Sequence, residues 1–276
     1  MARRAARRRH PFLDHAHPIP FAHRGGEVAG LENSMAAFQD AYDLGYRYVE
    51  TDLRATADGV LVAFHDEHLE RVTDATGQVE RLRYDQLARA RIGGQEPIPR
   101  FEELVASFPD VRWNIDVKAD SALAPLFERL VRDDDLLERI CIGAFSDARL
   151  ISVRTVLGER VCTSAGPNEV RQLRATSLLG PLSQRLPIGA DCVQVPTHYR
   201  RVPLVDRVML AAARAQGLPL HVWTVNEEAQ MRRLLALGVD GIITDETRIL
   251  RTVLEERGEW VLPHGAPGYE RRRHQR

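Results

Sequence analysis

The sequence predicts the α/β class, and within it a (β/α)₈ barrel of the TIM type. First, short apolar runs alternate with amphipathic helical patterns through almost the whole chain, the order of a parallel sheet with crossover helices. Second, nine runs have strand character, and one follows its predecessor too closely for a helical crossover. The eight that remain match the strand count of a TIM barrel. Third, no G-x-G-x-x-G follows the first strand, which counts against the alternative, an open doubly wound sheet.

The predicted elements follow in chain order. Strands are expected at 19–24, 47–53, 60–65, 112–118, 140–145, 160–164, 192–196, 220–225 and 241–244. Helices are expected at 33–44, 101–108, 121–132, 146–157, 203–216 and 226–237. Left-handed caps are expected at the glycines that directly follow helical patterns, Gly45, Gly158, Gly217 and Gly238.

The run at 60–65 is predicted to fold back on 47–53 as an antiparallel hairpin. Asp58-Gly59, between the two runs, is a strong two-residue turn signal. The run at 60–65 is therefore an extension after the second strand and not a member of the parallel set.

Three segments lie outside the strand–helix order. Residues 66–100 show little periodicity and contain glycine turns, so we expect a small insertion over the barrel mouth, within a barrel domain spanning 19–257. The ends, 1–18 and 258–276, are basic and predicted to be disordered. Weak contact of these tails with an anionic membrane surface is the functional alternative.

Composition narrows the class of protein. The chain has 276 residues, 44% hydrophobic and 28% charged, with a net charge of -1, so we expect a globular protein that does not bind nucleic acid. The Arg-rich start has no apolar segment behind it, and no stretch reaches 18 apolar residues, so neither a signal peptide nor a spanning helix is expected. The widely spaced cysteines, Cys141, Cys162 and Cys192, show no metal-binding or disulfide spacing. We expect buried, reduced thiols, as in a cytoplasmic protein.

Polar residues occupy one face of the predicted hairpin. With Asp58 and Gly59 as the turn, His65 lies opposite Asp52, and directly opposed residues point to the same side of a sheet. Glu50, two residues before Asp52, shares that side. The hairpin therefore predicts two carboxylates and an imidazole close together.

Two other strands end in the same kind of residue. Asp116 and Lys118 share one face of 112–118, and His23 and Arg24 close the first strand. In a barrel of this type the carboxyl ends of the strands carry the chemistry, so all these groups are expected to converge there. Lys118 is the only lysine of the chain.

Such a cluster suits metal-assisted cleavage of a phosphoester. Three carboxylates repel unless a cation lies among them, and oxygen ligands favour Mg²⁺ or Ca²⁺. Two histidines can serve as general base and general acid near neutral pH. An arginine and a lysine beside the metal would bind an anion, for which phosphate is the obvious choice.

The motifs resemble those of the glycerophosphodiester phosphodiesterase family, over roughly residues 20–250. The matching stretches are H-R-G at 23–25, E-N-S at 32–34, E-T-D at 50–52, D-G-V-L-V-A-F-H-D at 58–66, L-E-R-V-T-D-A-T-G at 69–77, I-P-R-F-E-E-L at 98–104, N-I-D-V-K at 114–118, V-W-T-V-N at 222–226 and G-V-D-G-I-I-T-D at 238–245. The resemblance implies a TIM-type barrel that hydrolyses glycerophosphodiesters to glycerol 3-phosphate and an alcohol, by way of a cyclic phosphate.

The resemblance also implies a role for each residue. His23 and His65 are the acid/base pair; Glu50, Asp52 and Asp116 are the ligands of one divalent cation; Arg24 and Lys118 bind the phosphate; and Trp223 is an aromatic wall for the substrate. The family commonly has Glu where Asp116 stands. A lysophospholipase D acting on lysolipids and a non-catalytic binding barrel are the alternatives. The first would show an apolar lip in 66–100, and the second would lack one of the central residues.

Overall fold

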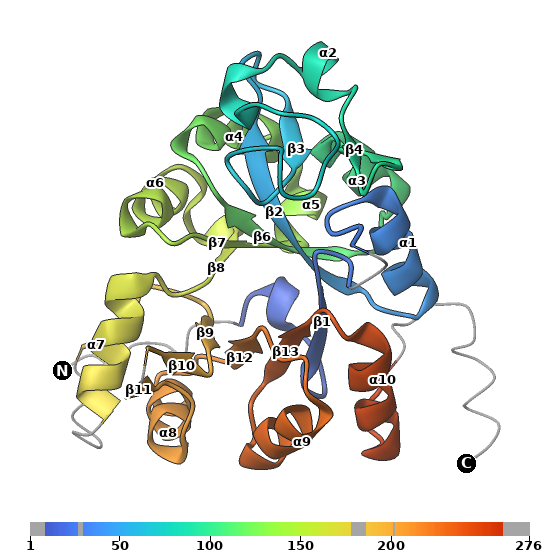
Figure 1. Cartoon of the computed structure of the whole chain (residues 1–276). Coiled ribbons are helices and arrows are strands. Elements are labelled where there is room, and N and C mark those ends of the chain that lie inside the picture. The colour runs from blue at the N-terminus through green and yellow to red at the C-terminus, as the bar shows by residue number, and fades with distance from the viewer. Residues whose placement is uncertain (1–8, 27–29, 178–185, 201, 262–276) are drawn as a thin grey trace.

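The computed structural model describes residues 9–26, 30–177, 186–200 and 202–261 (Figure 1). Its central strands are β1 (Ile19–His23), β2 (Tyr48–Ala55), β6 (Arg112–Val117), β7 (Ile140–Gly143), β8 (Cys162–Thr163), β9 (Val193–Pro196), β12 (Leu220–Trp223) and β13 (Gly241–Thr244). They pair in parallel in the order β8-β7-β6-β2-β1-β13-β12-β9. A parallel bridge between Ser164 and Cys192 joins the two ends of this row, so the sheet closes. The predicted eight-stranded parallel barrel is confirmed.

Helices surround the sheet. They are α1 (Met35–Asp43), α3 (Phe101–Ser107), α4 (Leu123–Leu130), α5 (Asp134–Glu138), α6 (Asp147–Leu157), α7 (Pro167–Ser177), α8 (Arg207–Ala215), α9 (Glu228–Leu237) and α10 (Thr247–Glu256). Their apolar faces and the outward side chains of the strands form the largest hydrophobic core. None of the described helices is both long and apolar enough to span a membrane.

Local sequence explains where these helices begin and end. The Ser34 hydroxyl accepts a hydrogen bond from Ala37 N and caps α1. Gly238 closes α9 in the left-handed conformation, with a φ of 94°. The predicted helix at 203–216 begins only at Arg207, because Asp206 caps it and the residues before it form the small ribbon of β10 (His198–Tyr199) and β11 (Val202–Pro203).

The hairpin of β2 and β3 (Leu61–Ala63) is antiparallel as predicted, but its predicted register is wrong. Leu53 lies opposite Ala63, and Phe64 N donates to Asp52 O, a position assigned above to His65. Thr56 N donates to Val60 O, so the turn has three residues between this pair. Gly59, the last of the three, has a φ of 80°. His65 lies beyond the end of β3, so strand alternation does not direct its side chain.

Residues 66–100 form a compact unit on β3. It contains η2 (Val79–Arg81), α2 (Tyr84–Leu87) and a ribbon of β4 (Arg91–Ile92) and β5 (Glu96–Pro97). It packs around a small hydrophobic core that joins its Leu69 and Leu87 to Phe64, which directly follows β3. Figure 1 shows this unit above the strand ends of β2 and β6.

The predicted disorder of the tails needs a correction at both ends. In 1–18, the short helix η1 (Pro11–Leu13) buries Phe12 and Leu13 completely, so this part of the segment is ordered. In 258–276, Trp260 packs against Tyr46 at a ring distance of 5.0 Å. Both corrections have the same reason: each tail carries a few large apolar side chains beside its charges. Residues 1–8 and 262–276 lie outside the described residues.

Candidate active site

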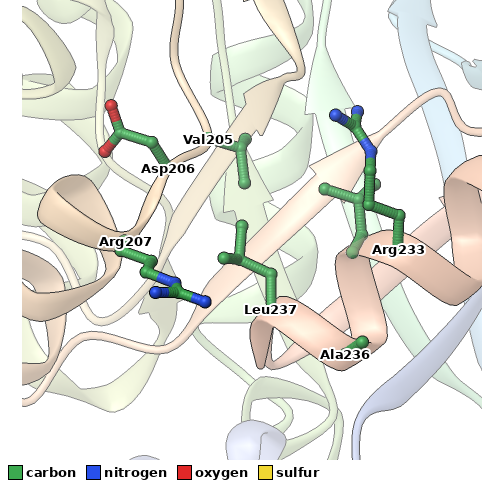
Figure 2. A pocket seen from close by; sticks show the side chains of 7 residues that line it. Val205, Asp206, Arg207, Arg233, Ala236 and Leu237 are labelled. Carbon is green, nitrogen blue, oxygen red and sulfur yellow. The ribbon is translucent and has the colours of Figure 1, made fainter.

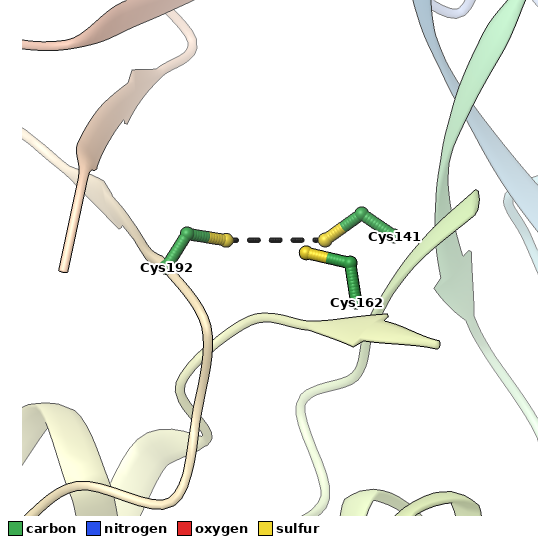
Figure 3. A group of neighbouring side chains, drawn as sticks. All are labelled: Cys141, Cys162 and Cys192. Atoms are coloured by element: carbon green, nitrogen blue, oxygen red, sulfur yellow. Dashed lines mark hydrogen bonds between the residues drawn. The ribbon is translucent and has the colours of Figure 1, made fainter. Parts of the chain in front are cut away.

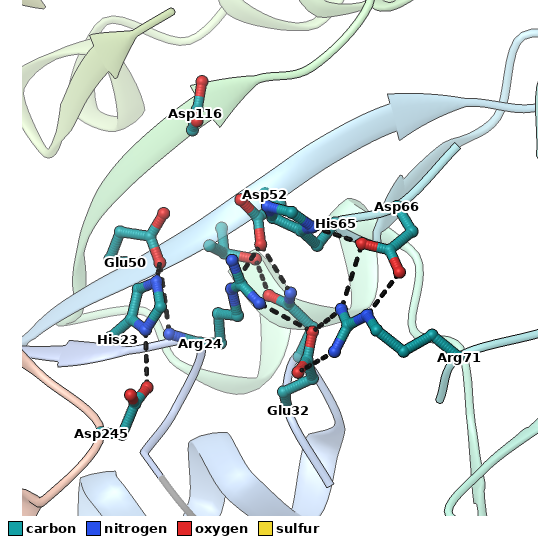
Figure 4. Close-up of polar contacts among 12 residues, drawn as sticks. His23, Arg24, Glu32, Glu50, Asp52, His65, Asp66, Arg71, Asp116 and Asp245 are labelled. Carbon is teal, nitrogen blue, oxygen red and sulfur yellow. Dashed lines mark hydrogen bonds and ion pairs between the residues drawn. The ribbon is translucent and has the colours of Figure 1, made fainter. Parts of the chain in front are cut away.

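Apart from His65, the predicted charged residues of the site lie on or directly after three adjacent strands, β1, β2 and β6 (Figure 4). Parallel pairing aligns His23 of β1 with Glu50 of β2, and Asp52 of β2 with Asp116 of β6. Because register places these positions side by side, the side chains project from neighbouring strand ends into the same region. The sequence-predicted cluster is therefore assembled, although the hairpin argument for His65 does not hold.

His23 is held by carboxylates on two sides. Its Nδ1 lies 2.6 Å from Asp245 Oδ1, and its Nε2 lies 3.7 Å from Glu50 Oε2. Burial lowers the pKa of this imidazole, but Glu50 and Asp245 together raise it above the ordinary value. Asn226 Nδ2 donates to the other oxygen of Asp245 at 2.7 Å, which fixes the orientation of that carboxylate.

His65 reaches the site from the start of the insertion. Its Nδ1 lies 2.5 Å from Asp66 Oδ1, and Arg71 also binds Asp66. These contacts, led by the hydrogen bond from Arg71, lower the pKa of Asp66 to about 2. Figure 4 shows the His65 ring beside Asp52, so both histidines reach the site with Nδ1 bound to a carboxylate.

Arg24 enters the site through a strained turn. Its φ is 53°, an unusual value for a residue other than glycine. The next residue must be glycine, because a Cβ on Gly25 would lie 2.7 Å from the backbone of Ala37. The turn brings Arg24 Nε to 3.0 Å from Asp52 Oδ2 and Arg24 Nη1 to 2.9 Å from Glu32 Oε1.

Lys118 lies between two aspartates. Its Nζ is 2.6 Å from Asp116 Oδ2 and 2.9 Å from Asp52 Oδ1. Burial lowers the pKa of this ammonium, but the two carboxylates raise it above the ordinary value. Asp52 is 1% exposed and has Lys118 and Arg24 beside it; burial raises its pKa, yet the two cations bring it below the usual value.

The three predicted metal ligands offer a donor set that fits a hard cation. All their donors are carboxylate oxygens, and the buried Oδ1 atoms of Asp52 and Asp116 have no hydrogen-bond partner of good geometry. Burial and the neighbouring Asp52 raise the pKa of Glu50 to about 7, a charge conflict that a cation would relieve. In the described conformation the three side chains do not bring an oxygen each to within 4.8 Å of one another.

Trp223 is half-buried at the end of β12. Its ring packs edge-on against Phe145, with a centroid distance of 5.6 Å. Phe145 is 66% exposed, and Lys118 Nζ lies 5.7 Å from its ring centroid. An aromatic pair therefore borders the cationic part of the site.

Several residues of the site were not singled out from the sequence. They are Glu32, Asn33, Asp66, Arg71, Asn226 and Asp245. Asn33 Nδ2 donates to Asp52 Oδ2 at 2.9 Å, and Glu32 joins Arg24 to Arg71. Asp245 directly follows β13, and Asn226 lies three residues after the end of β12, so position beyond a strand end was the available signal.

A surface pocket elsewhere on the molecule is not a second candidate for the active site. It lies between α8 and α9 and is lined by Val205, Asp206, Arg207, Arg233, Leu234, Ala236 and Leu237 (Figure 2). The carboxylate of Asp206 already caps α8 and pairs with Arg174. Arg207 and Arg233 are exposed.

Comparison with known proteins identifies the family of this chain. The model of the glycerophosphoryl diester phosphodiesterase family matches residues 23–249. A Mycobacterium tuberculosis protein named "Probable glycerophosphodiester phosphodiesterase 2" is 40% identical, over 90% of this chain and 95% of its own. A human lysophospholipase D is 25% identical over 84% of this chain and 85% of its own.

Solved structures share the fold. A glycerophosphodiester phosphodiesterase from Agrobacterium tumefaciens has a TM-score of 0.71 at 23% identity, covering 86% of this chain and 99% of its own. An Oleispira antarctica phosphodiesterase, solved with the product sn-glycerol-3-phosphate, has a TM-score of 0.71 at 21% identity, covering 87% and 97%. The matched family segment spans both predicted histidines and all three carboxylates. The chain is a phosphoric diester hydrolase and belongs to the glycerophosphoryl diester phosphodiesterase family.

Proposed function

We propose that this enzyme hydrolyses glycerophosphodiesters to sn-glycerol 3-phosphate and an alcohol, with the help of a divalent cation. The observation that carries the proposal is the placement of two carboxylate-held histidines around a cluster of Arg24, Lys118 and Asp52. The names of the bacterial relatives support the same substrate class.

His23 and His65 are proposed to move the protons. In both, Nδ1 makes a short hydrogen bond to a carboxylate, whereas Nε2 of His23 has only the longer 3.7 Å contact with Glu50. Nε2 is therefore the atom proposed to face the substrate. One histidine removes the proton of the glycerol hydroxyl next to the phosphoester, and that oxygen attacks phosphorus. The other protonates the departing alcohol oxygen as the ester bond breaks. Water then opens the cyclic phosphate, with the two roles exchanged.

Arg24 and Lys118 are proposed to bind the phosphate oxygens. Both are nearly buried, and both already lie against Asp52, which keeps them charged and fixed. Glu50, Asp52 and Asp116 would hold Mg²⁺ or Ca²⁺, which would supply positive charge for the phosphate when bound. Asp116 is one methylene shorter than the usual Glu, and its pairing with Lys118 ties the metal side of the site to the phosphate side.

Trp223 is proposed to form a wall for the substrate, together with Phe145. A large exposed aromatic ring beside a phosphate site also favours a second candidate, a lysophospholipase D activity on lysolipids. The human relative of that name supports it as well. The apolar lip that this alternative predicts within 66–100 would then lie at Phe145 instead.

The proposal is tested by following glycerol 3-phosphate release from glycerophosphocholine, glycerophosphoethanolamine and glycerophosphoinositol. The release of lysophosphatidic acid and choline from lysophosphatidylcholine is followed in parallel for the lipid substrate. We expect activity with the water-soluble diesters, its loss in EDTA, and its return with Mg²⁺ or Ca²⁺. Full activity in EDTA would refute the metal requirement, and a strong preference for lysophosphatidylcholine would establish the second candidate. Loss of this preference in Phe145→Ala would assign it to the aromatic pair.

Location and partners belong to the same proposal. Three free, buried cysteines suit a reducing compartment, which supports a cytoplasmic enzyme. A small-molecule substrate is the only partner proposed. Membrane contact through the basic tails concerns residues that lie mainly outside the described ones.

A further inference from the structure

Three thiols meet inside the barrel, away from the site described above. Cys141 of β7 is paired in register with Cys162 of β8, and Cys192 bridges to Ser164 at the seam that closes the sheet. All three are fully buried and belong to the hydrophobic cluster that includes Phe12 and Phe21. Figure 3 shows their sulfur atoms pointing toward one another. The closure of the barrel thus gathers cysteines that are far apart in the sequence.

The spacing of the sulfurs matches that of ligands around one ion. The three Sγ atoms lie within 4.8 Å of one another, and Cys141 Sγ is 3.8 Å from Cys192 Sγ. Four sulfurs around a zinc ion at about 2.3 Å are separated by roughly 3.8 Å, by tetrahedral geometry. A disulfide would need sulfurs at about 2.05 Å, so these thiols are close but not bonded.

A histidine with a free nitrogen lies beside the thiols. His221 is fully buried, its Nδ1 is 3.3 Å from Gln194 Nε2, and its Nε2 has no hydrogen-bond partner. Room for this ring depends on Gly241, because a Cβ there would lie 2.8 Å from His221 Cδ2. The imidazole of His221 lies close enough to Cys192 to act on its thiol. A buried polar atom without a partner is costly, and a ligand would satisfy it.

We propose that Cys141, Cys162 and Cys192 bind one thiophilic cation of the zinc type, with His221 as a further donor beside them. Three cysteines and a histidine are a standard ligand set for structural zinc, whereas Mg²⁺ and Ca²⁺ prefer oxygen. Binding replaces the thiol protons by the ion. The site is distinct from the carboxylate cluster, because Cys162 and Cys192 lie at the amino-terminal ends of their strands and the carboxylates project from the opposite end.

The apolar side chains around the three cysteines favour slow release of a bound ion. Phe12 and Leu13 of η1 cover this end of the barrel, so a bound ion is shielded from water and chelators. The ion would stabilise the native chain by a free energy that grows with the logarithm of its concentration relative to its Kd, since the separated cysteines of the unfolded chain form no site.

The test uses cobalt as a spectroscopic substitute for zinc. Reduced, metal-free full-length protein is titrated with Co²⁺, both as the native chain and after refolding with Co²⁺ present. We expect one equivalent to give a thiolate-to-cobalt charge-transfer band that Zn²⁺ removes and Mg²⁺ does not. Oxygen ligands give no such band, so cobalt at the carboxylate cluster cannot imitate this result. No band in either preparation would overturn the proposal.

Matched variants assign the band to the thiols. Cys162→Ala is expected to lose most of it, while Asp116→Asn, in the other cluster, is expected to keep it. Circular dichroism and phosphodiester hydrolysis report whether Cys162→Ala folds. A second measurement needs no variant: Zn²⁺ added during refolding should raise the Tm of the native sequence more than Mg²⁺ does. Equal shifts with both ions would count against the site, as would a band unchanged in Cys162→Ala.

Discussion

The two ends of the barrel are built from the same strands and have opposite chemistry. On β2, Tyr48 packs edge-on against Phe12 and Phe21 at one end, while two and four residues later Glu50 and Asp52 project at the other. On β1, Phe21 belongs to the apolar layer and His23 to the charged one. A step of two residues along a strand keeps the face and changes the layer. On β1 and β2, the same face therefore carries apolar packing residues near one end of the barrel and charged site residues near the other.

The energetic balance of the two ends differs as well. The apolar end gains free energy from burial, whereas each carboxylate at the mouth must be offset by a nearby cation. Asp52 illustrates the second case, because it is 1% exposed and bounded by Arg24 and Lys118. Changes at the mouth should therefore alter activity first, and changes at the closed end should alter stability first.

The largest expected effect is on turnover at the mouth. His23→Ala and His65→Ala should each lower kcat by about 10²–10⁴-fold, the usual contribution of a general acid or base, with little change in Tm. Initial rates of glycerol 3-phosphate release and thermal melting measure the two effects. His68→Ala is the matched control, because this neighbouring histidine has a side chain that is 61% exposed. Activity that survives in both variants would refute the acid/base assignment.

At the apolar end of the barrel we expect the converse, a loss of stability with little change in turnover. Phe12→Ala should lower the free energy of unfolding by about 3–5 kcal/mol, because a fully buried ring would leave a cavity. The kcat at a temperature where the variant is folded should remain near that of the parent. Urea unfolding measures the first quantity and steady-state kinetics the second. An unchanged unfolding curve would show that η1 is not part of the folded barrel.

Substitutions of Lys118 test whether activity and stability can be changed separately at the mouth of the barrel. Lys118→Met removes the cation that lies between Asp52 and Asp116, so both activity and stability should fall, the latter by up to about 3 kcal/mol. Lys118→Arg keeps the charge but needs more room, so it should restore most of the stability and little of the activity. A fully active Arg variant would mean that the single lysine of the chain has no special role.

The sequence predicted the barrel more completely than it predicted the contacts within it. The order of apolar runs and helical patterns was sufficient to predict the eight strands. The alternation of side chains with a period of two was sufficient to predict the polar face of β2. The hairpin register was wrong, because the turn depends on the Thr56 and Gly59 backbone and not on the Asp58-Gly59 pair alone.

Long-range contacts could not be predicted from local patterns. The bond between His23 and Asp245 joins residues 222 positions apart, and it exists only because β1 and β13 are neighbours in the closed sheet. Each cysteine alone resembled an ordinary core residue, and only barrel closure makes three of them a cluster. The buried Phe12 was missed because it lies within a segment rich in arginine and histidine.

The smallest expected effect is a pH dependence of stability at the border between the mouth and the insertion. Hydrogen bonds from Arg71 and His65 lower the pKa of Asp66 to about 2 in the folded chain, below its value of about 3.9 when unfolded. A carboxylate with a lowered pKa stabilises the fold fully above its unfolded pKa, and this contribution disappears as the pH falls through the folded pKa.

Asp66→Asn should therefore be less stable than the parent at pH 7, and the difference should shrink between about pH 4 and pH 2. Because the Asp66 side chain is 24% exposed, solvent and salt screen its charge and the difference should be small. Urea unfolding at low ionic strength is therefore the appropriate measurement. A difference that stayed constant down to pH 2 would mean that the Asp66 charge does not hold His65 in place, and that the orientation of this histidine comes from packing within the insertion.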